Sequence, residues 1–593
     1  MATRTSFGTG DSSPESPFLE RRDSPDIGDD LAELVDNFDH IHLNTHKKSS
    51  LVGSSSPFDP KKSKVTVQRP GDQKAYQCGP NVAKKNKKTD SDTLKEISKC
   101  KEEGRSRLDI SKSQITTLPA NIKDLAPNLK ELYLYSNKLI NLPNELGNLV
   151  NLEILMLQEN SLTALPDSLS QCRLLRILDI RHNKLCEIPQ FVFKLHNLTH
   201  LLLRFNRIRE VDPEIANLEK LQNLTLRENK IRLLPSNPGL EKLVNLQTFD
   251  ISHNHLEMLP EAIGHCTKLT TLNLQHNELK LIPETIGNLT ALERFGLRYN
   301  HLTSLPGSLS CCRMLCELNT EGNNISQLPE GLLTHLVHVT SIALSRNYFS
   351  SFPLGGPQQF ASTQTLNLDH NQITQIPFGI LSRAMFLTHL SMKDNLLTGL
   401  PPDVKSWENL VELNLGTNQL AKVPDDIEYL INLEVLILSN NQFKRLPPTV
   451  KKLQKLRILD LEENLLEFLP PDIGCLQELQ KLTVQSNRLT ELPVSIGNLR
   501  NLTYLAVGEN DLHSLPSEIG SMSALETLYL NDNLNLNDLP LELALCSNLQ
   551  IMSIENCPLN KIPLEIASGG PSLVIQYLKY FMQQINNPQE QQN

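Results

Sequence analysis

The sequence predicts an α/β solenoid, a curved array of about twenty repeats with a parallel sheet on its concave side. Two observations lead to this fold class. A unit of the form L-x-x-L-x-L-x-x-N-x-L-x-x-L-P-x-x-L is clearest from Leu152 to Leu174. Its Asn, at Asn160, returns at Asn183 and Asn206, each 23 residues on. One such unit cannot bury its own leucines, whereas stacked copies can.

The pattern is that of a leucine-rich repeat, so we expect a leucine-rich-repeat horseshoe with a parallel concave β-sheet and helical caps at both ends. The Asn position, called the slot below, identifies the repeats. Thirteen of the nineteen intervals between slots are 23 residues, five are 24 and one is 25. The slot residues are Ser113, Asn137, Asn160, Asn183, Asn206, Asn229, Asn254, Asn277, Asn300, Asn323, Asn347, Asn371, Asn395, Asn418, Asn441, Asn464, Asn487, Asn510, Asn533 and Cys557.

Each part of the unit has a physical role. The L-x-L segment is expected to form one short strand per repeat, with its leucines inward and the alternate residues on the concave surface. The slot Asn can donate and accept hydrogen bonds, so it can satisfy backbone groups that a buried bend would leave unpaired. The Leu-Pro pair fixes φ and ends strand pairing, which sends the chain across the convex side.

The chain divides into five predicted segments. The first is rich in Ser, Asp, Pro and Lys, so it buries too little apolar surface to fold. The second is a short helix with Leu94, Ile97 and Cys100 on one face, which would cover the first repeat. The segments are a disordered N-terminal tail (1–90), an N-terminal capping helix (91–104), the solenoid of about 20 repeats (105–570), a C-terminal capping helix (571–586) and a disordered tail (587–593).

Two stretches depart from the regular interval. The single 25-residue step carries Pro238-Gly239, which predicts a loop insertion on the convex side. Three consecutive 24-residue steps, from Asn323 to Asn395, contain Gly355-Gly356-Pro357. They predict an irregular middle with a change of curvature or twist.

Charge and hydropathy exclude several classes of protein. The formal net charge is −10 and the pI is about 5.9, so no nucleic-acid partner is expected. The N-terminus is polar and no apolar run reaches the roughly 18 residues that span a bilayer, which predicts neither a signal peptide nor membrane insertion. We therefore expect a cytoplasmic protein. The run Lys84–Lys88 is a candidate nuclear signal, for which a solvated charge run is the alternative.

The cysteines favour a reduced, intracellular protein over a disulfide framework. Cys172, Cys266, Cys312 and Cys546 each lie eleven residues before a slot, where Leu149 stands in an ordinary repeat. Their thiols are therefore expected to replace leucine in the core.

No catalytic constellation is evident. The sequence has no G-x-x-x-x-G-K-[ST] loop, no H-E-x-x-H and no G-x-S-x-G, so we expect no enzyme, no cofactor and no catalytic residue. His253 and His276 precede slots in adjacent repeats and could in principle bind a metal ion. Because no carboxylate or thiol completes a tetrahedral set, polar residues at the edge of the sheet are the preferred interpretation, and no metal site is expected.

The concave surface is where the residues suggest a function. Arg181, Arg204 and Arg227 each lie two residues before a slot in consecutive repeats, so their guanidiniums form a ladder at strand spacing. Like charges at that spacing repel, which predicts an anionic partner. Met156 and Phe205 are expected to be exposed apolar residues beside the ladder. The other residues predicted to share this surface are Tyr133, Tyr135, Asp179, His182, Arg298 and Tyr299.

Farther along the chain the charge reverses. Asp460, Glu462 and Glu463 make the C-terminal part of the concave face acidic. A solvated surface is the alternative for any single charge. The opposite signs of the two halves predict two different partners, or one partner with two faces.

Several strings are more specific than the repeat leucines. Together with the polar head and the twenty repeats, they make residues from about 92 to 582 resemble the Ras-pathway leucine-rich-repeat scaffolds of the Shoc/Sur family. The strings are Ile97–Glu103, Glu131–Asn137, Leu203–Ile208, Ile376–Ile380 and Ser553–Leu559.

The resemblance implies a scaffold that bridges a GTP-bound Ras-family GTPase, chiefly M-Ras, to the catalytic subunit of protein phosphatase 1. The assembled phosphatase would remove an inhibitory phosphate from Raf kinases and promote MAP-kinase signalling. The protein would meet the membrane only through its GTPase partner, and we expect a monomer when it is alone.

The resemblance also implies a division of the concave face between two partners. The residues that would face the acidic effector surface of the GTPase are Arg181, Arg204, Arg227 and Arg298. Those that would face the phosphatase, or be shared with it, are Tyr133, Tyr135, Asp179, His182, Asp460, Glu462 and Glu463.

One departure and two alternatives remain. Phosphatase partners often carry a basic residue followed by Val-x-Phe, and the nearest string here, Lys64–Val67, has Val where the aromatic residue should be. Docking through the tail is therefore a weaker hypothesis than docking through the repeats. The alternative class is another intracellular leucine-rich-repeat adaptor, an innate sensor or an adhesion scaffold without enzymatic activity. A repeat-fused ubiquitin ligase would need a catalytic Cys domain that the sequence lacks.

Overall fold

The computed structural model describes residues 90–236, 238–354 and 359–586. The described part begins with helix α2 (Asp90–Glu102) and continues as twenty strands of three residues each. The strands are β1 (Arg107–Asp109), β2 (Glu131–Tyr133), β3 (Ile154–Met156), β4 (Ile177–Asp179), β5 (His200–Leu202), β6 (Asn223–Thr225), β7 (Thr248–Asp250), β8 (Thr271–Asn273), β9 (Arg294–Gly296), β10 (Glu317–Asn319), β11 (Ser341–Ala343), β12 (Thr365–Asn367), β13 (His389–Ser391), β14 (Glu412–Asn414), β15 (Val435–Ile437), β16 (Ile458–Asp460), β17 (Lys481–Thr483), β18 (Tyr504–Ala506), β19 (Thr527–Tyr529) and β20 (Ile551–Ser553).

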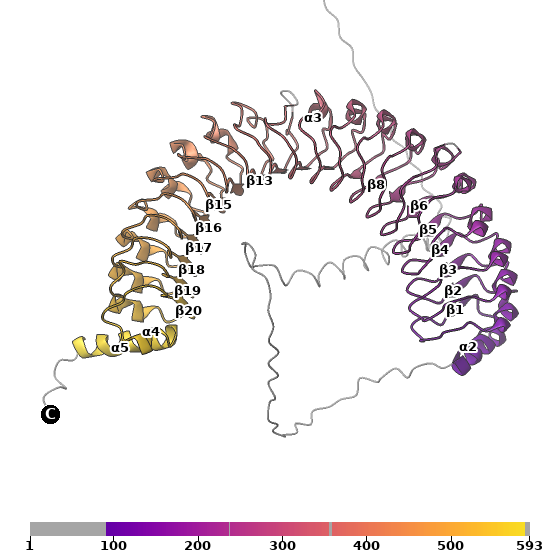
Figure 1. The fold of residues 1–593 in the computed structure, drawn as a ribbon, viewed down its shortest axis with the longest axis horizontal. Helices are drawn as coiled ribbons and strands as arrows, with labels where there is room; N and C mark the ends of the chain where they lie inside the picture. Colours follow the sequence, from indigo (N-terminus) through magenta and orange to yellow (C-terminus); the bar gives the residue numbers. More distant parts are fainter. Residues whose placement is uncertain (1–89, 237, 355–358, 587–593) are drawn as a thin grey trace, which may run out of the picture. The chain divides into compact units, whose positions relative to one another are not determined.

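Consecutive strands pair in parallel, from β1 with β2 to β19 with β20. Leu132 of β2 lies opposite Leu155 of β3, which lies opposite Leu178 of β4, and all three are fully buried. Within residues 90–586 the strands lie along the inner side of the array and their connections along the outer side (Figure 1). The predicted solenoid with a parallel concave sheet of about twenty repeats is confirmed.

The outer side is built from short 3₁₀ helices, which the sequence analysis did not anticipate. A proline directly precedes most of them, as Pro143 does with φ −74° and ψ 150°. Because proline fixes φ and lacks an N–H group, it ends strand pairing and suits the start of a helix. The helices are η1 (Ala120–Leu125), η2 (Asn144–Asn148), η3 (Asp167–Gln171), η4 (Gln190–Lys194), η5 (Pro213–Asn217), η6 (Leu240–Lys242), η7 (Glu261–His265), η8 (Glu284–Asn288), η9 (Gly307–Cys311), η10 (Val404–Trp407), η11 (Asp425–Tyr429), η12 (Pro448–Lys452), η13 (Ile473–Cys475), η14 (Val494–Asn498), η15 (Ser517–Ser521) and η16 (Leu541–Leu545).

The slot asparagines hold adjacent repeats together. Asn206 Oδ1 accepts a hydrogen bond from the backbone N–H of Leu185, in the preceding repeat, at 3.0 Å. Its Nδ2 donates to the carbonyl oxygens of Ile180 and Leu203, each at 3.0 Å. The same three kinds of contact recur at Asn418. The predicted role of the slot residue in satisfying backbone groups is therefore confirmed.

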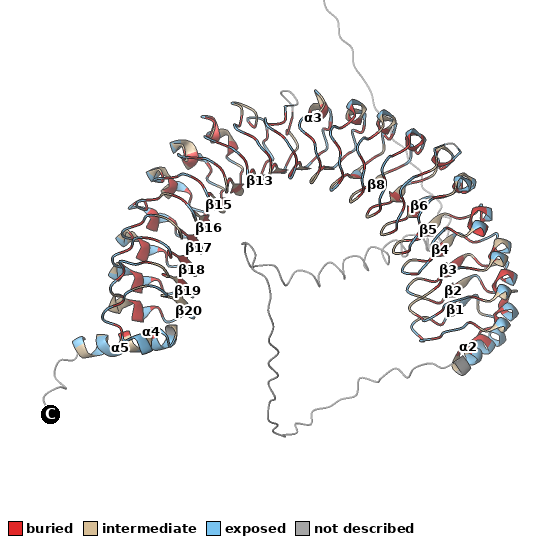
Figure 2. Ribbon diagram, viewed as in Figure 1, coloured by how far each residue is buried: buried red, intermediate tan, exposed pale blue. Residues whose placement is uncertain are grey.

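The core is one leucine-rich cluster between the strands and the outer segments (Figure 2). The four cysteines predicted to replace leucine are all buried. The Sγ atom of Cys266 lies 3.4 Å from the carbonyl oxygen of Leu240 in the preceding repeat. Burial, with a smaller contribution from Glu241, raises the pKa of Cys266 to about 12, so its thiol stays protonated and behaves as a small apolar group.

The middle of the array is irregular on its outer side. Helix α3 (Leu332–His335) stands between β10 and β11 in place of a 3₁₀ helix, and the described residues between β11 and β13 contain no helix. Gly355-Gly356-Pro357 lies outside the described residues. The irregularity is confirmed, and the change of curvature stays a prediction. At the 25-residue interval, Ser236 and Gly239 form an isolated antiparallel bridge.

Helix α2 lies against the first repeat. Thr93, Ile97 and Cys100 are buried, and the helix contacts β1 and η1. Leu94 is 44 % exposed, so the prediction that it lines the buried face is wrong. Positions i, i+4 and i+7 share one face of a helix, and Leu94 lies one residue off that face.

At the other end, α4 (Leu564–Ala567) and α5 (Pro571–Asn586) follow β20. Val574 and Leu578 of α5 are buried, and α5 contacts η16. That α2 and α5 act as caps stays a prediction, as do the exact segment boundaries. The two predicted disordered tails lie outside the described residues, apart from Asp90, which begins α2.

A candidate protein-interaction surface on the inner face

The strand register sets the inner-face side chains in rows. The backbone N–H of His182 donates to the carbonyl oxygen of Arg204, and that of Phe205 donates to the carbonyl oxygen of Arg227, each at 2.9 Å. Arg181, Arg204 and Arg227 therefore occupy the same position on three successive repeats. The spacing of these arginines in the sequence predicts this row. Binding of a partner by the row stays a prediction.

Arg181 is not the uncompensated charge that the sequence analysis expects. Its Nε and Nη2 atoms donate to the two carboxylate oxygens of Asp179, at 3.0 and 2.8 Å. The Asp179 side chain is fully buried and that of Arg181 is 14 % exposed. The expectation of repulsion until an anionic partner arrives is therefore wrong at this rung, because a carboxylate two residues away on the same face neutralises the guanidinium.

Arg204 and Arg227 are half-buried. The Arg204 guanidinium lies 5.1 Å from the ring centre of Phe205, which is a cation–π geometry. Nη2 of Arg227 lies 4.0 Å from Oε1 of Glu228. Burial raises the pKa of Asp250, and the nearby charges of Arg227 and Arg204 oppose that rise. Both guanidiniums thus keep part of their surface on the inner face, within the field of a neighbouring carboxylate.

Met156 is buried, with 7 % of its surface exposed, so the prediction that it is an exposed apolar residue is wrong. It ends β3, opposite Tyr133 of β2 on one side and Asp179 of β4 on the other. Because paired strands lie only about 4.8 Å apart, its neighbours cover it. Phe205 is half-buried, and its ring stacks on that of His182 with centroids 4.3 Å apart.

Two tyrosines continue the inner face toward the first repeat. Tyr133 donates its hydroxyl hydrogen to Oε2 of Glu131 at 3.1 Å, and the Arg107 guanidinium lies 4.3 Å from its ring centre. Burial, together with the charge of Glu131, raises the pKa of Tyr133 to about 12. Tyr135 is half-buried, with Nζ of Lys112 5.6 Å from its ring centre. Each tyrosine has an apolar ring with a polar tip, which is a residue type suited to an interface.

The residue directly before the slot forms a second row, at the rim of the sheet. In every repeat it has a positive φ, between 51° and 70°, which points successive side chains the same way. Rings stack along this rim, His253 on His276 at 4.2 Å and His276 on Tyr299 at 4.5 Å. This backbone rule was not predicted from the sequence. A signal was present, because Thr417 is the only β-branched residue at this position, and β-branched residues rarely adopt positive φ.

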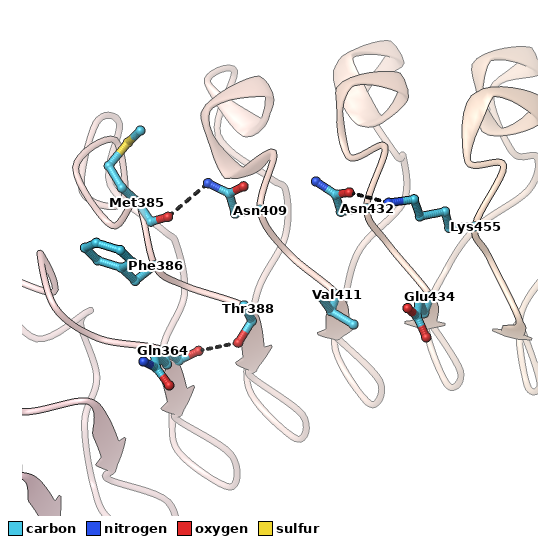
Figure 3. A pocket seen from close by; sticks show the side chains of 9 residues that line it. All are labelled: Gln364, Met385, Phe386, Thr388, Asn409, Val411, Asn432, Glu434 and Lys455. Carbon is cyan, nitrogen blue, oxygen red and sulfur yellow. Dashed lines mark hydrogen bonds between the residues drawn. The ribbon is translucent and has the colours of Figure 1, made fainter.

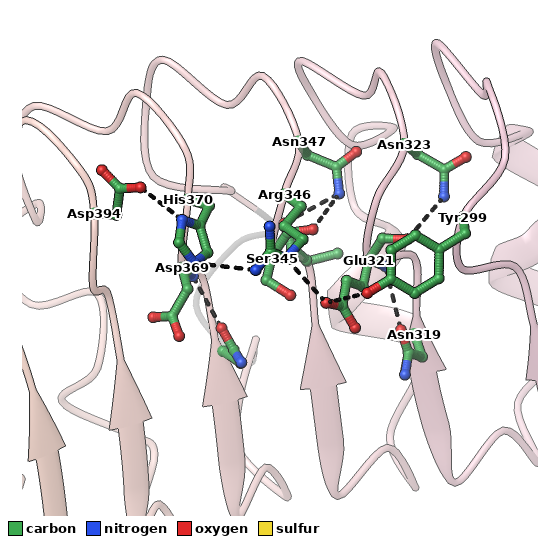
Figure 4. A network of polar contacts seen from close by, with 12 residues as sticks. Tyr299, Asn319, Glu321, Asn323, Ser345, Arg346, Asn347, Asp369, His370 and Asp394 are labelled. Atoms are coloured by element: carbon green, nitrogen blue, oxygen red, sulfur yellow. Dashed lines mark hydrogen bonds and ion pairs between the residues drawn. The ribbon is translucent and has the colours of Figure 1, made fainter. Parts of the chain in front are cut away.

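A polar network of rim residues, together with Glu321 two residues before its slot, crosses the irregular middle (Figure 4). Tyr299 donates its hydroxyl hydrogen to Oε1 of Glu321 at 3.0 Å, and Nε of Arg346 lies 3.5 Å from the same oxygen. Nη2 of Arg346 lies 3.5 Å from Nε2 of His370, and Nδ1 of His370 lies 2.6 Å from Oδ2 of Asp394. The five residues come from five successive repeats, so the network ties together the stretch whose outer side is irregular.

Arg298 and the acidic patch lie apart from the arginine row. Nε of Arg298 donates to Oε1 of Gln275 at 2.6 Å. Asp460 ends β16, and Glu462 and Glu463 lie in the turn that follows. Burial raises the pKa of Glu462, and the charges of Asp460 and Glu463 raise it further. These carboxylates therefore share one field, which a cationic partner would relieve.

Binding is the chemistry that this face can perform. The described residues contain no cluster of His, Cys, Asp and Glu suited to a metal ion. None of the helices between residues 90 and 586 is long and apolar enough to cross a membrane. The arginine row and the rings beside it lie in the N-terminal half of the inner face, and Asp460, Glu462 and Glu463 lie in its C-terminal half.

Family models for leucine-rich repeats match several parts of the chain. One described as a leucine-rich repeat region matches residues 449–561. A second, described as a leucine rich repeat, matches 127–185, 173–231 and 196–256. A third, also described as a leucine rich repeat, matches 268–289 and 432–453.

Curated relatives match shorter stretches. The chain is 69 % identical over 49 residues to a leucine-rich repeat protein soc-2 homolog of Nematostella vectensis, 8 % of each chain. It is 67 % identical over 49 residues to the leucine-rich repeat protein SHOC-2 of Danio rerio, 8 % of this chain and 9 % of that one. It is 54 % identical over 111 residues to a soc-2 homolog of Drosophila grimshawi, 19 % of this chain and 17 % of that one. The matched stretches span less than a fifth of these relatives.

Solved structures share the fold over longer stretches. The plant peptide hormone receptor RGFR1 in complex with RGF2 aligns with a TM-score of 0.58 at 27 % identity, over 76 % of this chain and 86 % of that one. YopM from Yersinia enterocolitica aligns with a TM-score of 0.57 at 24 % identity, over 80 % of this chain and 96 % of that one. The second likeness supports the solenoid fold alone.

Proposed function

The chain is a leucine-rich-repeat protein similar to the soc-2 and SHOC-2 proteins, and on that premise we propose that it is a non-catalytic scaffold for two signalling proteins. One is a GTP-bound Ras-family GTPase, chiefly M-Ras, and the other is the catalytic subunit of protein phosphatase 1. Both bind the inner face, and the assembled phosphatase dephosphorylates Raf kinases in Ras/MAP-kinase signalling.

The arginine row is the observation that carries this proposal. Arg204 and Arg227 stand in register on neighbouring repeats, half-buried, and Phe205 lies between them along the chain. Partly desolvated arginines beside aromatic rings are the side chains that carry most binding energy in protein interfaces. An acidic effector surface of a GTPase supplies the carboxylates that two guanidiniums at strand spacing can bind.

The acidic patch supports a second partner. Glu462 has a raised pKa because it is partly buried among carboxylates, so a cationic side chain docked there removes an existing penalty. The same patch repels the carboxylates that the arginine row attracts. The two halves of the inner face therefore select different partners, and we assign the acidic half to the phosphatase.

The test is affinity purification of both partners at physiological salt. The variant is Arg204→Glu plus Arg227→Glu. The matched control is Arg207→Glu plus Lys230→Glu, which lies on the same two repeats and makes the same change in net charge, at exposed positions past the slot. We expect the first variant to lose the GTP-loaded GTPase and the control to retain it.

A second variant, Asp460→Lys plus Glu462→Lys, addresses the phosphatase. It should lose the phosphatase while the GTPase alone is still retained. Retention of the GTPase by the double-arginine variant, with thermal unfolding unchanged, would contradict the assignment of the arginine row.

A further inference from the structure

A groove of about 430 Å³ lies on the edge of the array where the strands begin (Figure 3). It is opposite to the edge that carries the slot and the rim. One wall comes from the turns that lead into the strands, with Met385, Asn409, Asn432 and Lys455. The other wall comes from residues directly before β12 to β15, among them Gln364. The groove therefore crosses five repeats at right angles to the strands, away from the inner face.

One end of the groove is apolar and exposed. Met385 and Phe386 are 57 % and 62 % exposed, and Val411 beside them is half-buried. In the next repeat the position of Phe386 is taken by Asn409, whose Nδ2 donates to the carbonyl oxygen of Met385 at 2.9 Å. Phe386 replaces this repeat-linking amide with an aromatic ring in water. A neighbouring pair of exposed large apolar residues is typical of an interaction site.

The other end is polar, with Asn432, Glu434 and Lys455 among its lining residues. Nζ of Lys455 donates to Oδ1 of Asn432 at 2.7 Å, which uses one of the three donors of the ammonium group. Glu434, on the opposite wall, pairs with Nη1 of Arg457 at 3.4 Å. Among the described residues, Lys455 is the one cation that lines the groove, and Glu434 already has a cationic partner in Arg457. The charge fits an incoming carboxylate.

We propose that this groove binds a short extended segment of a partner protein, with an aromatic or long aliphatic side chain on Phe386 and a carboxylate on Lys455. The two anchor points lie three repeats apart, which is about 14 Å at strand spacing. An extended chain advances about 3.3 Å per residue, so four or five residues separate the two anchors. The side-chain amide oxygen of Asn409, on a repeat between the two anchors, can accept a hydrogen bond from the backbone of the bound segment.

The probes are fluorescein-labelled ten-residue peptides in which Phe and Glu stand four or five positions apart in a Gly/Ser background. Matched peptides replace Phe by Ala, Glu by Gln, or Glu by Lys. Binding to the full chain is measured by fluorescence anisotropy. The chain variants are Phe386→Asp and Lys455→Glu. The matched control is Met314→Asp, which changes an apolar residue at the same repeat position as Phe386, 46 % exposed.

We expect the Phe/Glu peptide to bind with a Kd below about 1 mM and the Ala and Gln peptides to bind more weakly. Phe386→Asp should weaken binding about tenfold, and Met314→Asp should leave it unchanged. Lys455→Glu should weaken binding of the Phe/Glu peptide and strengthen binding of the peptide in which Lys replaces Glu. This exchange of charge preference cannot arise from misfolding.

Three outcomes would overturn the proposal. They are no binding of the Phe/Glu peptide at about 1 mM, an equal loss in Met314→Asp, and no change of charge preference in Lys455→Glu. The variant Arg204→Glu plus Arg227→Glu should bind the peptide as the wild type does. Failure of the groove proposal is thereby distinguished from failure of the proposed inner-face function.

Discussion

Replacing Asn206 by alanine tests how strongly the hydrogen bonds of the slot asparagines stabilise the array. The change removes three hydrogen bonds, to Leu185, Ile180 and Leu203. Asn206 is 8 % exposed, so the backbone groups left behind lie away from water. At about 1 to 2 kcal/mol for each of the three buried groups left without a partner, the free energy of unfolding should fall by about 3 to 6 kcal/mol.

Asn197→Ala is the matched control, because it removes the same side chain from the same repeat. Nδ2 of Asn197 donates to the carbonyl oxygen of Arg173 at 2.8 Å in an exposed setting, where water can replace the lost contact. We expect a loss of about 1 kcal/mol or less. The two variants thus differ in burial and in the number of backbone groups that each amide satisfies.

The measurement combines urea unfolding, followed by circular dichroism, with hydrogen exchange resolved by mass spectrometry. Repeat arrays open locally, so the peptide containing the Leu185 amide should exchange faster in Asn206→Ala than in Asn197→Ala. Equal losses of stability in the two variants, or unchanged protection at Leu185, would refute the argument that the amide bridges neighbouring repeats.

Three further predictions follow from burial and close packing. Burial lowers the pKa of His253 and of His276 from 6.5. Just below that pH the folded state therefore binds fewer protons than the unfolded state. The stability that the two neutral histidines contribute is present above about pH 6.5 and is lost as the pH falls. His253→Gln plus His276→Gln should therefore flatten the pH dependence of urea unfolding, and an unchanged slope would argue against these histidines. Burial raises the pKa of Cys172 to about 11 while Cys186 is exposed, so iodoacetamide followed by mass spectrometry should label Cys186 and spare Cys172; equal labelling would show an accessible core thiol. Gly147→Ala would place a Cβ too close to the Ser168 carbonyl oxygen, whereas a Cβ at Gly307 would meet nothing within 4 Å. Calorimetry should show a loss of stability of about 1 to 3 kcal/mol for Gly147→Ala and a much smaller change for Gly307→Ala. Equal melting temperatures of the two variants would contradict the close approach.

The fold is predictable because the repeat is encoded locally and many times over. Each slot in the sequence marks one strand, so the slots give the number of strands. A side-chain amide at a buried bend is expected to hydrogen-bond the backbone groups there. The 3₁₀ helices are less predictable, since a Leu-Pro pair specifies where pairing ends but not how the chain crosses the outer side. The Leu94 error has a similar cause, because a short helix carries too few apolar residues to fix which face is buried.

The alternation of side chains along a β-strand predicts some features of the inner face and misses others. It places Arg181, Arg204 and Arg227 in one row, because every strand has the same register. The alternation predicts the direction in which a side chain points but not how far its neighbours bury it, so the burial of Met156 was missed. The pairing of Arg181 with Asp179 was also missed, although residues two apart in a strand lie on the same face.

This pairing changes which arginines can serve recognition. Because Asp179 is fully buried, its carboxylate depends on Arg181 for neutralisation, and an incoming carboxylate would have to compete with it. Binding energy at this rung is therefore small, and removing Arg181 would mainly leave a buried charge without its strongest partner. Arg204 lies over the ring of Phe205, and Arg227 lies 4.0 Å from the carboxylate of Glu228; both arginines are half-buried on the inner face. The row is in this sense asymmetric: one rung fixes the local structure, and the next two carry the recognition proposed for the inner face.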